Sequence, residues 1–272
     1  MDTRSRLELA NDNAAGFWLA QARVHGWESV RTPWFTAVRC DGEAEVHRFV
    51  VTRPHGEPGV LRQELLGVLR RWRTARLCLE DPYGSLDLRP HGCEASLGQA
   101  VMVREPGGAP AADGAAVPAA PRGRRGEPAG RLTVGEALSP EQLGEVERVV
   151  VDGFPMPARL PFVRGAMLPP GLLDAPGHRA WVARVDGRPA GACVSHDDGT
   201  AVGLYSVATL PEHRSRGIGR ALVAAVLSAH PDRPATLTST LLGEPLYRRL
   251  GFTEHGVARW WRYPATPSSM TV

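Results

Sequence analysis

The pattern of apolar and polar positions predicts two α/β halves in this chain. In the first half, apolar side chains recur at helical spacing in two segments, and short alternating or continuously apolar runs mark strands. The predicted elements are helices over residues 7–25 and 58–72 and strands over residues 34–39, 45–52, 76–80 and 100–103. Their order predicts a small α/β domain over residues 1–105.

The second half, residues 131–272, contains a longer series of strands and helices. Ser139 and Pro140 are residue types of a helix N-cap and first helical position, and apolar residues follow at helical spacing. Apolar runs predict strands over residues 132–134, 181–185, 189–196, 204–209, 236–240 and 257–263, and a further helix from Ile218. The predicted fold class is therefore α/β, with a mixed sheet.

Two segments lack this periodicity and are rich in Gly and Pro. Residues 106–130 cannot bury enough surface to offset their chain entropy, so we predict a linker between the two halves. Residues 153–171 also carry apolar side chains. They are predicted either to wall a substrate pocket or to cover an edge of the sheet.

Composition limits the classes of function. All 32 basic residues are Arg, and with 29 acidic residues the net charge is only +3, so we expect no nucleic-acid partner. The polar start shows no secretory signal, and no apolar run approaches about 20 residues, so we expect a cytoplasmic protein with no membrane partner. The four Cys residues are scattered without metal-ligand spacing, so we expect reduced thiols and no metal.

The most informative stretch joins the strand ending at Thr209 to the helix that starts at Ile218. Gly217 and Gly219 flank Ile218, where the first backbone N–H groups of a helix have no intrahelical partner. These donors and the positive end of the helix dipole favour a phosphate or diphosphate. Neither a dinucleotide-binding fingerprint nor a Walker loop fits, because Leu222 replaces the third glycine and no Gly-Lys-Ser/Thr follows Gly217.

The stretch resembles the acyl-CoA-binding motif, R-x-x-G-x-G, of the GNAT superfamily of N-acyltransferases. Here it reads Arg214-x-x-Gly217-x-Gly219, after Val207-Ala208-Thr209. Farther along, the run from Leu246 to Phe252, LYRRLGF, is similar to that family's second signature, a short helix with a Tyr that ends in Leu-Gly-Phe. The resemblance covers roughly residues 131–263.

The resemblance implies a mostly antiparallel sheet flanked by helices, acetyl-CoA as co-substrate, and transfer to a small-molecule or peptide amine by direct attack in a ternary complex. Tyr247 would donate a proton to the departing thiolate. Backbone groups at the strand end and the residues that open the helix would hold the co-substrate. The implied binding residues are Val207, Ala208, Thr209, Arg214, Ser215, Arg216, Gly217, Ile218, Gly219 and Arg220.

Several points stay open at this stage. The alternative function is a non-catalytic module that senses CoA or a nucleotide. Residues 52–59, the strand-to-helix connection of the first half, lack R-x-x-G-x-G, so we expect residues 1–105 to be non-catalytic, either as a degenerate GNAT-like unit or as an unrelated α/β domain. A homodimer is one option for the assembly. The general base is not identified: His196 beside Asp197 reads as a surface turn residue, and Glu212 and Glu244 read as caps or solvated charges.

Overall fold

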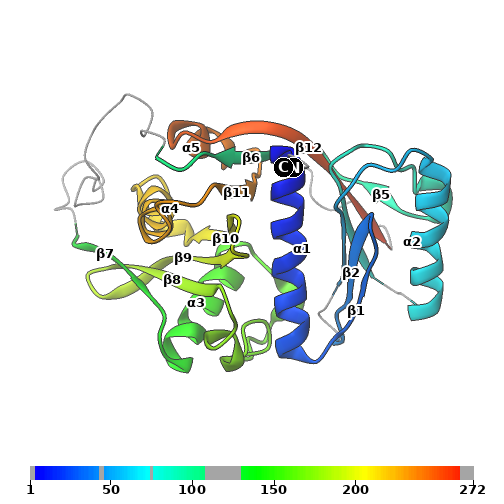
Figure 1. Cartoon of the computed structure of the whole chain (residues 1–272). Coiled ribbons are helices and arrows are strands. Elements are labelled where there is room, and N and C mark those ends of the chain that lie inside the picture. The colour runs from blue at the N-terminus through cyan, green and yellow to red at the C-terminus, as the bar shows by residue number, and fades with distance from the viewer. Residues whose placement is uncertain (1–3, 43–45, 74–75, 108–129, 264–272) are drawn as a thin grey trace. The chain divides into compact units, whose positions relative to one another are not determined.

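The computed structural model describes residues 4–42, 46–73, 76–107 and 130–263. The chain divides into two compact units. Unit 1 contains Met1–Val103, Thr238–Leu242 and Glu254–Val272, and unit 2 contains Arg104–Leu237 and Gly243–Thr253. Both units combine a largely antiparallel sheet with flanking helices, which confirms the predicted fold class (Figure 1).

Unit 1 begins with a helix that is capped at both ends. Ser5 and Glu8 form a capping box at its start, and Gly26 ends it at φ 72°. The elements are α1 (Arg6–His25), β1 (Glu28–Arg31), β2 (Phe35–Arg39), β3 (His47–Val51), α2 (Pro58–Trp72), β4 (Leu77–Asp81), β5 (Glu94–Ala95), β6 (Gln99–Arg104) and β12 (Thr253–Tyr263). Strands β1, β2 and β3 pair antiparallel, and β3 pairs parallel with β4 through the α2 crossover.

Alternating side chains of the unit 1 sheet pack against a helix on each face. On one face, Phe35, Ala37 and Phe49 lie with the apolar stripe of α2 in a buried cluster that includes Trp261 of β12. On the other face, Val38 packs with Trp18 and Ala22 of α1. This period of two is the one expected for a strand buried on both faces.

Unit 2 is a five-stranded sheet with helices on opposite faces. Its elements are β7 (Leu132–Glu136), α3 (Pro140–Gly153), β8 (His178–Val185), β9 (Arg188–Asp197), β10 (Val202–Thr209), α4 (Ile218–Ala229), β11 (Ala235–Thr238) and α5 (Glu244–Arg249). The strand order is β7-β8-β9-β10-β11, with only β10 and β11 parallel. Figure 1 shows α3 and α4 on the two sides of β8, β9 and β10. As predicted, the Ser139 hydroxyl caps α3, accepting from Gln142 N–H at 3.3 Å.

The same succession of elements occurs in both units. Each has a helix, three antiparallel strands, a second helix and a strand parallel to the third. These are α1, β1–β3, α2 and β4 in unit 1, and α3, β8–β10, α4 and β11 in unit 2. The sequence did not reveal β1, because this four-residue strand is mostly exposed and lacks an apolar run.

The two units divide the chain differently from the expected domains. Thr238–Leu242 and the chain from Glu254 on belong to unit 1, whereas the sequence grouped both with residues 131–272. For the chain from Glu254 on, the reason is that β12 pairs antiparallel with β4 and β5. The predicted linker falls largely on residues 108–129, which lie outside the described residues. Within the described ranges, no helix is both long and apolar enough to cross a membrane, and the cytoplasmic location stays a prediction.

Candidate functional site

The start of α4 has the geometry of an anion-binding site. Gly217 is its N-cap residue at φ 80° and ψ 3°, and no side chain caps the helix. Two positions earlier Ser215 is also left-handed, at φ 61°. Alternation of left- and right-handed residues before a helix turns successive N–H groups toward one side, where an anion can accept from them.

Three glycines shape this turn, one through its backbone conformation and two by allowing close packing. Gly217 needs its left-handed conformation, whereas a Cβ at Gly219 would lie 3.2 Å from Leu246 Cδ2 of α5. The third is Gly191 on β9, where a Cβ would lie 2.5 Å from Ile218 Cγ2. Sequence reasoning missed Gly191, although an isolated glycine in an apolar strand can indicate close approach of another element.

Strand β10 leaves its parallel neighbour before it ends. It pairs with β11 only through Val202 and Gly203, whereas it stays paired with β9 as far as Thr209. A bulge between Tyr205 and Ala208 and the left-handed Ser206, at φ 51°, accompany the change. In the described part of the two strands, the edge of residues 204–209 that faces away from β9 therefore has no ladder with β11.

The structure places the predicted Arg residues in different roles. Arg214 donates from Nη2 to the Gly153 carbonyl at 3.0 Å and from Nε to the Thr209 carbonyl at 3.3 Å. It thus ties the end of β10 to the end of α3. Arg216 is half-buried in the glycine turn, and Arg220 lies in the first turn of α4. All three keep positive charge near the helix start.

Tyr247 is buried on α5 near β9. Its side chain is 8% exposed and its ring meets Phe252 edge-on, with centroids 5.8 Å apart. Burial, with a smaller contribution from the nearby Cys193 thiol, raises the pKa of Tyr247. The phenol therefore carries its proton at neutral pH. Gly251, at φ 85°, ends this short helix as the sequence predicted.

His196 differs from its predicted surface position. It is 4% exposed and lies across from His178 on β8. Burial, and then the His196 charge, lower the pKa of His178 to about 4. His196 pairs with Gly203, six residues before the end of β10 at Thr209, in the part of the strand that still pairs with β11. His196 is therefore not identified as the base.

The other charged candidates do not identify a base either. Asp197 follows His196 on β9; its carboxylate lies 3.3 Å from His230 Nδ1 and forms an ion pair with Arg233 at 3.5 Å. Glu244 is paired with Arg248 at 2.7 Å, and Glu212 is exposed before the turn. Across the described ranges, no group of three or more His, Cys, Asp or Glu could hold a metal ion.

Comparison with known proteins agrees with this geometry. Residues 176–254 match the family model described as an acetyltransferase (GNAT) domain. No curated protein matches the chain significantly. A GCN5-related N-acetyltransferase from Kribbella flavida is 20% identical, with a TM-score of 0.62, over 94% of this chain and 96% of its own. At these identities the structural likeness concerns the fold.

Two further solved structures share this fold. A tandem GNAT protein from the clavulanic acid biosynthesis pathway is 18% identical, with a TM-score of 0.53, over 86% of this chain and 79% of its own. A GCN5-related N-acetyltransferase from Sphaerobacter thermophilus is also 18% identical, with a TM-score of 0.52, over 84% of this chain and 76% of its own.

Proposed function

We propose that the protein transfers an acetyl group from acetyl-CoA to an amine in a ternary complex, on the premise that residues 176–254 match the model of a GNAT acetyltransferase domain. The observation that carries the proposal is the start of α4. There a left-handed glycine turn without a capping side chain lies beside a strand, β10, that has separated from β11. The first feature suits a diphosphate, and the second suits an extended amide-containing arm.

Each part of the co-substrate has a matching part of unit 2. The N–H groups of residues 215–220 would donate hydrogen bonds to the diphosphate oxygens, with Arg216 and Arg220 adding charge. The backbone of Val207, Ala208 and Thr209 would pair with the amides of the pantetheine arm. A backbone N–H at this strand end would also stabilise negative charge as it develops on the thioester oxygen during amine attack. Arg214 would act through the carbonyls it binds, by fixing the end of β10.

Tyr247 would assist departure of the thiolate by donating a hydrogen bond from its hydroxyl. Its raised pKa keeps the phenol neutral, which favours donation. The same shift makes full proton transfer to a thiolate, whose conjugate thiol has a pKa of about 8.5, unfavourable. The expected contribution is therefore charge stabilisation, with the proton supplied finally by solvent or by the ammonium product.

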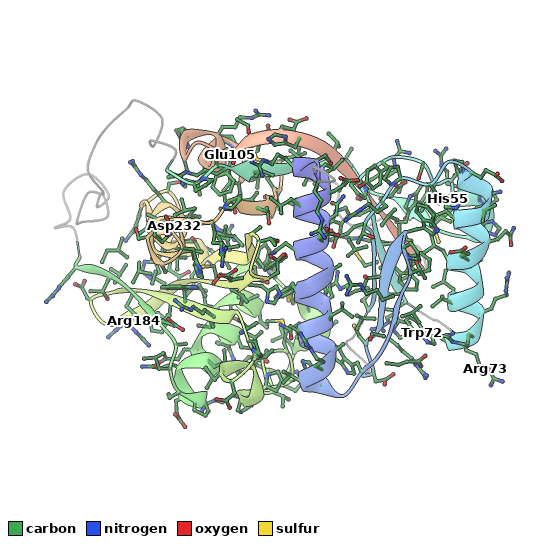
Figure 2. The ribbon with its side chains drawn as sticks, viewed as in Figure 1. His55, Trp72, Arg73, Glu105, Arg184 and Asp232 are labelled. Carbon is green, nitrogen blue, oxygen red and sulfur yellow. The ribbon has the colours of Figure 1, made fainter. Side chains whose placement is uncertain are left out.

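Unit 1 lacks the corresponding anion site, although its elements follow the same order. At the start of α2, Glu57 N–H donates to His55 Nδ1 at 2.9 Å, and Pro58 has no N–H. Figure 2 shows His55 at this end of α2, with Trp72 and Arg73 at the other end. The exposed Glu57 carboxylate would also repel a phosphate. We therefore assign CoA binding to unit 2 alone, and a non-catalytic role to unit 1.

The proposal can be tested with acetyl-CoA and a panel of amines. Isothermal calorimetry measures binding of CoA, and a thiol-release assay measures turnover with small amines, amino acids and peptides. Binding together with turnover supports the transferase. Binding without turnover of any acceptor favours the alternative, a CoA-sensing module. Failure to bind CoA refutes both, because both depend on the α4 turn.

A further inference from the structure

The short helix that carries Tyr247 is held at its end by a residue from far earlier in the chain. Arg104, the last residue of β6, donates from Nε to the Leu250 carbonyl at the end of α5, at 3.0 Å. Both residues belong to unit 2. Arg104 is half-buried, and burial lowers its pKa, so the bond to this carbonyl replaces part of the hydration that the guanidinium loses. The catalytic roles assigned above do not include Arg104.

The Leu250 carbonyl lies at the turn that ends α5. Gly251, at φ 85°, donates its N–H to the Arg248 carbonyl at 3.1 Å, and the Phe252 N–H donates to the Tyr247 carbonyl at 3.1 Å. These two bonds form the pattern of a Schellman motif, which is commonly accompanied by an apolar contact across the turn. Here that contact is the edge-on meeting of the Phe252 and Tyr247 rings. The turn after Leu250 therefore also determines where the Tyr247 ring lies.

The position of α5 depends on contacts at both of its ends. A helix of six residues has little stability of its own. Its ion pair between Glu244 and Arg248 lies at the surface and adds little. At its start, Leu246 packs against the first turn of α4, since a Cβ at Gly219 would lie 3.2 Å from Leu246 Cδ2. At its other end, the hydrogen bond from Arg104 holds the last turn.

We propose that Arg104 is a positioning residue for Tyr247, and that its bond to the Leu250 carbonyl keeps the Tyr247 hydroxyl where it can donate to the departing thiolate. This inference rests on the proposed acetyl transfer and deepens the role of Tyr247 in it. Arg104 acts through the backbone of residues 250–252 and the Phe252 ring. Displacement of a catalytic group by about 1 Å can lower a rate by about 100-fold, so loss of the Arg104 bond should be visible in kcat.

The test compares Arg104→Met with a matched control, Arg249→Met. Methionine keeps an unbranched side chain at position 104 but has no N–H donor in it. Arg249 is exposed on α5 itself, so its change removes one Arg while the donor to Leu250 stays. Hydrogen exchange of the amides of residues 244–252, followed by mass spectrometry, should be at least about tenfold faster in Arg104→Met than in wild type, beyond any change in global unfolding. Arg249→Met should exchange as wild type does.

The kinetic arm is a double-mutant cycle with Tyr247→Phe, measured with an amine that the panel identifies as an acceptor. Arg104→Met should lower kcat by at least about tenfold, while CoA affinity in calorimetry stays within about twofold. In the Tyr247→Phe background the same change should alter kcat by less than about twofold, because no hydroxyl is left to position. Arg104→Lys keeps the charge and a donor and should retain part of kcat. It takes the place of Arg104→Met in the cycle if that variant fails to fold.

The outcomes separate this inference from the proposed function. Equal exchange of wild type and Arg104→Met overturns the anchoring of α5. A normal kcat in Arg104→Met, or an equal loss of kcat with and without the Tyr247 hydroxyl, overturns the positioning role. Failure of wild type to acetylate any amine refutes the proposed function and the role of Tyr247 with it, whereas the exchange result still decides whether Arg104 holds α5.

Discussion

Two substitutions at position 217 that differ only in charge should distinguish an effect on folding from an effect on CoA binding. Gly217 has φ 80°, and a Cβ there would meet no atom within 4 Å. Asn and Asp tolerate this left-handed conformation better than most residues, at a cost of about 1–2 kcal/mol. Gly217→Asn and Gly217→Asp should therefore lose similar unfolding free energy. The two variants differ in one negative charge beside the proposed diphosphate site.

The magnitude follows from Coulomb's law. A carboxylate about 5 Å from two phosphate charges costs about 0.8 kcal/mol per charge even at the dielectric constant of water, or about 1.7 kcal/mol in total. Gly217→Asp should thus bind CoA about 15-fold more weakly than Gly217→Asn at low ionic strength. The difference should shrink at 1 M salt, where the screening length falls to about 3 Å.

Calorimetric titration of the two variants, at about 0.01 M and 1 M salt, measures this difference. Pantetheine, which lacks the diphosphate, is the control ligand and should bind both variants equally. Urea unfolding checks that the two are equally stable. Equal CoA affinity of the Asn and Asp variants at low salt would refute diphosphate binding at the α4 turn.

Three other predictions test the surroundings of the site. Tyr247→Phe should lower kcat by about 100-fold with CoA affinity unchanged in calorimetry, because only the hydroxyl is removed; normal turnover would exclude Tyr247 from the chemistry. Gly191→Ala should destabilise unit 2 by about 1–3 kcal/mol in urea unfolding and should weaken CoA binding. The reason is that the added Cβ would lie 2.5 Å from Ile218 Cγ2 and 3.1 Å from the Ala208 carbonyl oxygen. The third concerns His178, whose pKa is lowered from 6.5 to about 4 in the folded protein. Below pH 6.5, unfolding therefore takes up a proton at His178. The unfolding free energy of wild type should decrease between pH 6.5 and 4 by up to about 3 kcal/mol. His178→Gln should show a smaller decrease over that window, and an equal decrease would contradict the assignment.

Local chemistry made much of unit 2 predictable from the sequence. Gly217 and Gly219 before an apolar helix indicated the turn, and the structure gives α4 a left-handed glycine N-cap. Ser139 likewise indicated the cap of α3, where its hydroxyl is found. Such signals depend on a few consecutive residues, so they are readable without knowing the tertiary fold.

Contacts between distant residues were not predictable in this way. Glu147 reads as one more acid on a helix, and only the fold brings its carboxylate to backbone N–H groups 18–21 positions away. His196 reads as a turn residue because Asp197 and Gly199 follow it, yet its pairing with β8 buries it. The pairing of the last strand was not predictable for the same reason, since its partners β4 and β5 lie far earlier in the chain.

Comparison of the two units shows which sequence feature is specific to the proposed CoA site. Both place a helix after the third antiparallel strand, and both follow that strand with an Arg that donates to a backbone carbonyl at the strand's end or one residue past it. Arg53 donates to Thr52 at 2.7 Å, and Arg214 donates to Thr209 at 3.3 Å. What differs is the short connection that follows. In unit 1, the His55 side chain accepts from one backbone N–H, and Pro58 lacks an N–H. In unit 2, the left-handed Gly217 begins α4 without a capping side chain, so no side chain accepts from the first N–H groups of the helix. The order of elements therefore does not determine CoA binding, and the proposed activity depends on the backbone chemistry of residues 215–220.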